Sequence, residues 1–156
     1  MKAEISIRPA TVQDLPVILH HRREMFRSMG YTDARILEPL EPIAQRYFVE
    51  AFKSGTFRGW MAVEPHGKIV GGAGIADYTL PPGHFASNAT RQEIINVYVE
   101  PEFRRQGIAK RLMEVMIEWC RDHGYSSVYL HASEEGRPLY TSMGFAPTPE
   151  MRLSLK

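Results

Sequence analysis

Alternating and helical hydrophobic patterns divide the first third of the chain into a strand and two helices. Residues 4–8 alternate apolar and polar side chains, as a strand with one buried face does. Apolar positions then recur at helical spacing between Thr11, which has the character of a helix N-cap, and Met29. Residues 31–42 contain two prolines and no clean period, so we expect a loop there, before a second helix at 43–53.

The middle of the chain has the pattern of three consecutive strands. Residues 57–63 and 68–78 are joined by Glu64-Pro65-His66-Gly67, which has good turn chemistry and predicts a hairpin. The glycine run at 71–74 is followed by no helix, so it indicates a bulge or a close backbone approach. Residues 93–99 are rich in β-branched and aromatic side chains and predict the third strand.

The last third predicts a helix, a buried strand, a short helix and a final strand. Apolar residues recur at helical spacing in 108–123, and Gly124 is placed to end this helix. Residues 127–132 are typical of a buried strand, 134–142 of a short helix, and the alternating residues 151–155 of a last strand. The order β-α-α-β-β-β-α-β-α-β predicts an α/β (α+β) fold with a mixed sheet.

Composition narrows the class of protein. The 156 residues most simply form one domain, 1–156. Nineteen basic against eighteen acidic residues give a net charge of +1, which argues against nucleic-acid binding by bulk charge. One cysteine, Cys120, suits a reducing compartment, and no apolar run approaches the length of a bilayer crossing. We expect a cytoplasmic protein whose partners include neither nucleic acid nor membrane.

A basic turn containing a glycine joins the strand at 93–99 to the helix at 108–123. The first N–H groups of a helix have no partner within it, and the helix dipole favours an anion there. Gly107 allows the backbone to approach a phosphate closely, and Arg104 and Arg105 add positive charge. The alternative is an ordinary turn with solvated arginines, and the turn alone does not decide between them.

Two motifs in this region resemble a known family. Arg104-Arg105-Gln106-Gly107-Ile108-Ala109 resembles the Arg/Gln-x-x-Gly-x-Gly/Ala signature of the GNAT superfamily of N-acetyltransferases, which is related to histone acetyltransferases. Leu139-Tyr140-Thr141-Ser142-Met143-Gly144-Phe145 is similar to the Tyr-x-x-x-Gly-Phe segment of that family. The resemblance implies a GNAT-like, mostly antiparallel central sheet flanked by helices. It also implies acetyl-CoA as the co-substrate, without a metal, and the six histidines show no paired metal-ligand spacing.

The resemblance assigns the coenzyme A site to the strand, the basic turn and the segment after the buried strand. The strand backbone would pair with the pantetheine arm, and the N–H groups of the turn would bind the pyrophosphate. Ser133 stands where many relatives carry an asparagine, and Arg137 either contacts the cofactor or caps its helix. The expected cofactor-binding residues are Val97, Tyr98, Val99, Arg104, Arg105, Gln106, Gly107, Ile108, Ala109, Lys110, Ser133 and Arg137.

Two catalytic roles follow from the same resemblance. Tyr140 is the expected general acid, because its phenol is protonated at neutral pH and many relatives protonate the coenzyme A thiolate from this position. Glu93 is the expected general base, acting through water, and its sequence context resembles that of histone-type members. The alternatives without a catalytic role are a packed aromatic side chain for Tyr140 and a solvated carboxylate at a strand end for Glu93. Other groups that remain open as the base are Asn96, Asp77, Glu24 and His131.

The predicted function is transfer of the acetyl group of acetyl-CoA to a primary amine of a small molecule or peptide, by direct attack in a ternary complex. The acceptor side would be built from the first two helices and the loop Leu80–Ala89. An acyl-CoA-binding sensor or partner-binding module with weak catalysis is the alternative. A homodimer is expected from the family alone, and the identity of the amine stays open.

Overall fold

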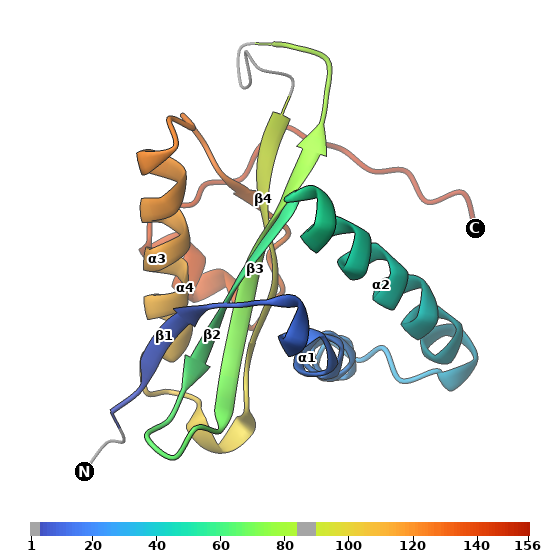
Figure 1. The fold of residues 1–156 in the computed structure, drawn as a ribbon. Helices are drawn as coiled ribbons and strands as arrows, with labels where there is room; N and C mark the ends of the chain where they lie inside the picture. Colours follow the sequence, from blue (N-terminus) through green and yellow to red (C-terminus); the bar gives the residue numbers. More distant parts are fainter. Residues whose placement is uncertain (1–3, 84–89) are drawn as a thin grey trace.

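A twisted sheet runs through the centre of the computed structural model, which describes residues 4–83 and 90–156 (Figure 1). Within that part of the chain, five strands lie side by side in their order along the sequence. The first four pair antiparallel, and the last pairs parallel to its neighbour, so the predicted mixed, mostly antiparallel sheet is confirmed. The strands are β1 (Ser6–Pro9), β2 (Phe57–Val63), β3 (Ile69–Thr79), β4 (Thr90–Val99) and β5 (Tyr129–Leu130).

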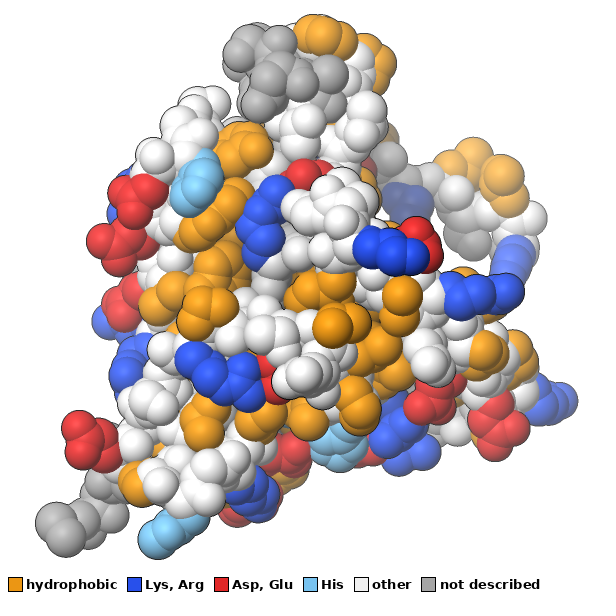
Figure 2. Space-filling model, in the orientation of Figure 1, with side chains coloured by type: hydrophobic (Ala, Val, Ile, Leu, Met, Phe, Trp, Pro, Cys, Tyr) orange, Lys and Arg blue, Asp and Glu red, His pale blue; other side chains and the backbone are white. Residues whose placement is uncertain are grey.

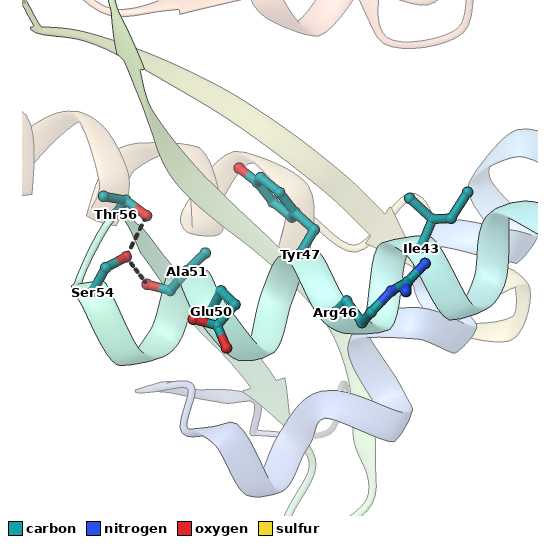
Figure 3. Close-up of a pocket in the computed structure, with 7 residues that line it drawn as sticks. All are labelled: Ile43, Arg46, Tyr47, Glu50, Ala51, Ser54 and Thr56. Atoms are coloured by element: carbon teal, nitrogen blue, oxygen red, sulfur yellow. Dashed lines mark hydrogen bonds between the residues drawn. The ribbon is translucent and has the colours of Figure 1, made fainter.

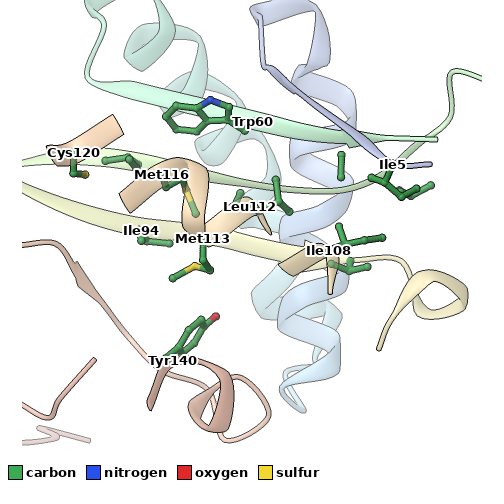
Figure 4. Close-up of a cluster of buried hydrophobic side chains, with 14 residues drawn as sticks. Ile5, Trp60, Ile94, Ile108, Leu112, Met113, Met116, Cys120 and Tyr140 are labelled. Atoms are coloured by element: carbon green, nitrogen blue, oxygen red, sulfur yellow. The ribbon is translucent and has the colours of Figure 1, made fainter. Parts of the chain in front are cut away.

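Helices cover both faces of this sheet (Figure 1). One hydrophobic cluster lies beneath α3 (Ile108–Asp122), between this helix and the sheet. Leu112, Met113 and Met116 of the helix are fully buried in it (Figure 4). A second cluster lies on the opposite face, where the rings of Phe48 and Phe57 are 4.9 Å apart. Burial of such side chains stabilises the fold by about 1.5–3 kcal/mol each, which fixes the helices on the sheet. The helices are α1 (Leu15–Ser28), α2 (Ala34–Ser54), α3 (Ile108–Asp122) and α4 (Arg137–Ser142), with short 3-10 turns η1 (Val12–Asp14) and η2 (Pro101–Phe103).

The second helix starts earlier than the sequence pattern predicts. The loop expected at 31–42 is wrong from Ala34 onward, because Asp33 caps the helix by accepting a hydrogen bond from the N–H of Arg35. Pro39 and Pro42 lie inside the helix, where each removes one backbone donor. Both prolines are exposed, so water can solvate the carbonyls that lose their partners, and the helix continues through them.

The final strand predicted at Met151–Leu155 is also wrong. In the structure, residues 145–156 contain no helix or strand, and Figure 1 shows the segment running away from the sheet. Met151, Leu153 and Leu155 are 94%, 81% and 90% exposed. The segment 151–155 pairs with no described strand, because the neighbouring strand β5 is only two residues long and offers too short an edge.

Basic and acidic side chains are interspersed over the face shown in Figure 2, in keeping with the net charge of +1. In the described chain, no helix is both long and apolar enough to cross a bilayer. The loop expected to border the acceptor at Leu80–Ala89 falls partly outside the described residues, at 84–89.

Candidate active site

An extra residue in β4 bends this strand against β3. Gly72 pairs with Tyr98 and Gly74 pairs with Ile95, so β4 advances three residues where β3 advances two. Asn96 lies in this extra step with a φ of 61°, a left-handed conformation that asparagine adopts more readily than most residues. The bulge expected in the glycine run is therefore found opposite that run, on β4.

Beyond this bend, β4 and β5 diverge. The two strands pair only at Glu93 with Tyr129 and at Ile94 with Leu130. No other described strand lies against this side of β4, so residues 97–99 border a free sheet edge. An extended ligand can pair with such an edge as an added strand, and this is where the family resemblance implies the pantetheine arm.

The side chains along this edge point to opposite faces of the sheet. Val97 and Val99 pack in the cluster beneath α3, whereas the ring of Tyr98 lies 5.1 Å from that of His21 in α1. Burial lowers the pKa of His21 to about 4, so the imidazole is neutral at pH 7 and packs against the tyrosine. Packing thus occupies the side chains of Val97, Tyr98 and Val99, and a ligand would use their backbones.

The turn after β4 contains two left-handed residues directly before α3. Arg105 and Gly107 are left-handed, with φ of 62° and 82°, and Gly107 is the N-cap of α3. A Cβ at Gly107 would meet no atom within 4 Å, so backbone conformation and not crowding favours glycine here. The N–H groups that follow lie at the start of a fifteen-residue helix, where they lack intrahelical acceptors.

The side chains around this turn differ in what they can offer a ligand. Arg105 and Lys110 are exposed, whereas Ile108 is buried and contributes only its backbone, as half-buried Ala109 would. The amide nitrogen of Gln106 lies 3.5 Å from a backbone carbonyl of the preceding 3-10 turn.

Arg104 is attached to the strand. Its Nε donates a 2.8 Å hydrogen bond to the carbonyl of Val99, and its guanidinium lies over the Tyr98 ring at 5.5 Å. The side chain of Arg104 thus ties the basic turn to β4.

Ser133 and Arg137 lie in the segment that leads into α4. The Ser133 hydroxyl accepts a 3.1 Å hydrogen bond from the N–H of Gly136, so it stabilises this turn. Arg137 is half-exposed and lies 4.0 Å from Glu134, in a weak local ion pair. The structure therefore leaves Arg137 freer than Ser133 to contact a ligand.

Tyr140 lies in α4 with its ring at the edge of the cluster beneath α3 (Figure 4). The side chain is only 9% exposed, and burial raises the pKa of its phenol above the ordinary value. Gly136 permits this placement, because a Cβ there would come within 2.7 Å of the ring. Tyr140 is therefore a protonated, buried phenol at neutral pH.

Glu93 is buried inside β4, so the interpretation as a solvated residue at a strand end is wrong. Its side chain is 1% exposed and pairs with Arg91 at 3.0 Å and with Nδ1 of His131 at 2.7 Å. The His131 side chain is 79% exposed, so it links this buried carboxylate to solvent.

The other groups considered for the base have different surroundings. Asp77 and Glu24 pair with arginines at 2.8 and 2.7 Å, and Asn96 donates a 3.2 Å hydrogen bond to the carbonyl of Ile18. Among these candidates, His131 is the one that the structure brings into contact with Glu93.

Sequence reasoning missed two arginines of this region. Arg91 is two residues before Glu93 in the same strand, and that spacing already places both side chains on one face. Arg22 occupies a position on the apolar stripe of α1, between Ile18 and Phe26. A charged residue on such a stripe was the available signal.

A solvent-open depression of about 450 Å³ lies along α2, away from these residues (Figure 3). None of the site residues expected from the sequence lines it. Tyr47 forms part of its wall and turns its ring toward the sheet. The full lining is Ile43, Arg46, Tyr47, Glu50, Ala51, Ser54 and Thr56.

Comparison with known proteins agrees with the fold and with the motifs. The acetyltransferase (GNAT) family model matches residues 18–145. Human N-acetyltransferase 8 is 33% identical over 121 residues, which are 76% of this chain and 49% of that protein, so the chain spans about half the length of this relative.

Two solved structures resemble the whole fold. A GCN5-related N-acetyltransferase from Ralstonia eutropha JMP134 has a TM-score of 0.89 and 31% identity, covering 97% of this chain and 99% of that one. A protein from Clostridium acetobutylicum, described as a predicted acetyltransferase with acetyl-CoA, has a TM-score of 0.85 and 26% identity, covering 97% of both chains. The chain belongs to the GNAT family of acetyltransferases.

Proposed function

We propose that this protein transfers the acetyl group of acetyl-CoA to a primary amine of a small molecule or peptide, by direct attack in a ternary complex. The observation that carries this proposal is the divergence of β4 from β5 directly before the glycine-bearing start of α3. One extended ligand with a pyrophosphate can use both features at once. The Clostridium acetobutylicum relative described with acetyl-CoA supports the same ligand.

The residues of this chain would divide the binding of acetyl-CoA between backbone and side chains. The backbones of residues 97–99 pair with the pantetheine arm, and the N–H groups of residues 105–110 bind the pyrophosphate. Arg105 and Lys110 add charge, while Arg104 holds the turn in place through Val99. Ser133 shapes the turn before α4, and Arg137 contacts the outer part of the ligand.

The chemistry then needs one group to accept a proton and another to donate one. The amine nitrogen forms a bond to the acetyl carbon, the carbon–sulfur bond breaks, and Tyr140 donates its proton to the departing sulfur. Glu93 takes up the proton of the amine through water, and His131 passes it to solvent. Reprotonation of Tyr140 from solvent completes the cycle.

The direct test is an assay of thiol release from acetyl-CoA with a panel of primary amines. We expect release to depend on the amine and to equal the amount of acetylated product. Binding of acetyl-CoA without transfer to any amine would contradict the proposal and favour the acyl-CoA sensor. Failure of both binding and transfer in the folded protein would exclude both functions.

Replacing Glu93 with glutamine should lower kcat/KM at pH 7 by about 100-fold for amines of high pKa. The loss should shrink for amines with a pKa near 7, because these arrive largely neutral and need no base. The same thiol assay, run on wild type and variant with amines of different pKa, measures this dependence.

Asp77→Asn is the matched control, since it also removes a carboxylate that pairs with an arginine on the sheet. We expect this variant to lose some thermal stability and to keep the wild-type dependence on amine pKa. An equal loss for all amines in Glu93→Gln would assign Glu93 a structural role only.

A further inference from the structure

Arg22 is a half-buried cation without an acidic partner in the described part of the chain. Arg23 and Arg27 on the same helix, and Arg58 and Arg91 on the sheet, all lie within 4 Å of carboxylates. Among the described residues, Arg22 has one long hydrogen bond, 3.5 Å from its Nη1 to Oδ1 of Asn96, and no ion pair.

Aromatic packing accounts for only part of the position of Arg22. Its guanidinium carbon lies 4.9 Å from the ring centre of Phe26 and 5.9 Å from that of Phe48, so it helps to pack α1 on α2. Ring faces attract the charge and accept no strong hydrogen bond, whereas a guanidinium has five N–H donors in a fork that fits an oxyanion. The unfilled donors therefore favour an anionic ligand.

The surroundings of Arg22 place that ligand on the acceptor side. Asn96, which Arg22 contacts, is the bulge residue at which β4 leaves β5. Glu93 lies three residues before Asn96 in the same strand, so the expected base belongs to the same region.

We infer that Arg22 binds a carboxylate or phosphate group on the amine that accepts the acetyl group. This inference rests on the proposed acetyl transfer and adds the chemical class of the acceptor. An anionic group on Arg22 would set the amine beside the divergence of β4 and β5, where the donor is expected.

Matched amines test this inference. Each pair differs in its anionic group: an α-amino acid and its carboxamide, and a phosphorylated amino sugar and its unphosphorylated form. Rates are compared per concentration of neutral amine, because the anionic group also raises the pKa of the amine. In wild type, the anionic member of at least one pair should have a kcat/KM about 10- to 100-fold higher, mainly through KM. The pair that shows the preference distinguishes carboxylate from phosphate.

The variant Arg22→Met keeps a long apolar side chain over the two phenylalanines and removes the charge. It should abolish the preference while changing the neutral amines by less than about twofold. Arg27→Met removes an exposed charge from the same helix and should keep the wild-type preference. Equal kcat/KM within both pairs, or equal losses for anionic and neutral amines in Arg22→Met, would overturn the inference.

Calorimetric titration of the coenzyme A-saturated protein with the anionic amines separates this inference from the proposed transfer. Binding that Arg22→Met abolishes, without acetylation of any amine, would support the anion site and contradict the transfer. Acetylation of neutral amines with no preference for anionic ones would support the transfer and contradict the anion site. Neither binding nor acetylation would contradict both.

Discussion

Replacing Tyr140 with phenylalanine should lower kcat by about 100-fold or more while the dissociation constant for acetyl-CoA stays within about threefold. Burial raises the pKa of this phenol, so the proton is present throughout the neutral range and is available to the departing thiolate. Phenylalanine keeps the ring that packs against Gly136 and removes only the donor. Steady-state kinetics beside calorimetric titration with acetyl-CoA measures both quantities.

The pH dependence of kcat, measured for wild type and for Tyr140→Phe, gives a second readout. In wild type, kcat should not fall on the alkaline side until above about pH 10, because that is the ordinary pKa of tyrosine and burial raises it further. Tyr125→Phe is the matched control: this half-buried tyrosine stacks near Trp119 on the far end of α3 and should keep wild-type turnover. Wild-type kcat in Tyr140→Phe at every pH would remove Tyr140 from the mechanism.

Replacing Gly107 with glutamate should raise the dissociation constant for coenzyme A by about 100-fold or more, because a carboxylate would face the pyrophosphate at the start of α3. Gly124 offers a close control at the other end of the same helix. Gly107 and Gly124 have φ of 82° and 79°, and a Cβ at either would meet nothing within 4 Å. Each substitution should cost about 1–2 kcal/mol of stability through the left-handed backbone alone.

Calorimetric titration of both variants with acetyl-CoA, desulfo-CoA, ATP and NAD separates binding from strain. We expect Gly124→Glu to bind both coenzyme A ligands as wild type does, and wild type to prefer them over ATP and NAD. Similar losses of coenzyme A binding in the two variants would point to strain and remove the turn from the site. Equal affinity of wild type for ATP would indicate a general nucleotide site.

The first strands of the sheet and most helices can be predicted from the sequence, because their hydrophobic patterns and capping residues lie close together in the chain. A left-handed N-cap at Gly107 and a helical stripe from Ile108 onward can be inferred from residues close together in the chain. The last strand was predicted wrongly, because the alternation of apolar and polar residues at 151–155 does not show whether a neighbouring strand is available for pairing. The early start of α2 was hidden by Pro39 and Pro42, because interior prolines normally break a helix and the helix here continues through them.

The candidate site was only partly visible for a related reason. The burial of Glu93 depends on Arg91 beside it and on His131, which arrives after α3. The unpaired state of Arg22 depends on the absence of a carboxylate among its described neighbours, and spacing along one helix cannot reveal this. Contacts between distant segments decide both features.

The hydrogen bond between Asn96 and Ile18 also bears on how the protein folds. The three glycines of β3 have no side chains by which β4 could recognise its alignment, and glycine-rich strands are prone to slip. The side-chain amide of Asn96 donates to a carbonyl 78 residues earlier in the chain. A slip by one residue would break this hydrogen bond and exchange the side chains between the two faces of the sheet. The bond from Asn96 to α1 therefore stabilises the correct alignment of β4 relative to one shifted by a residue.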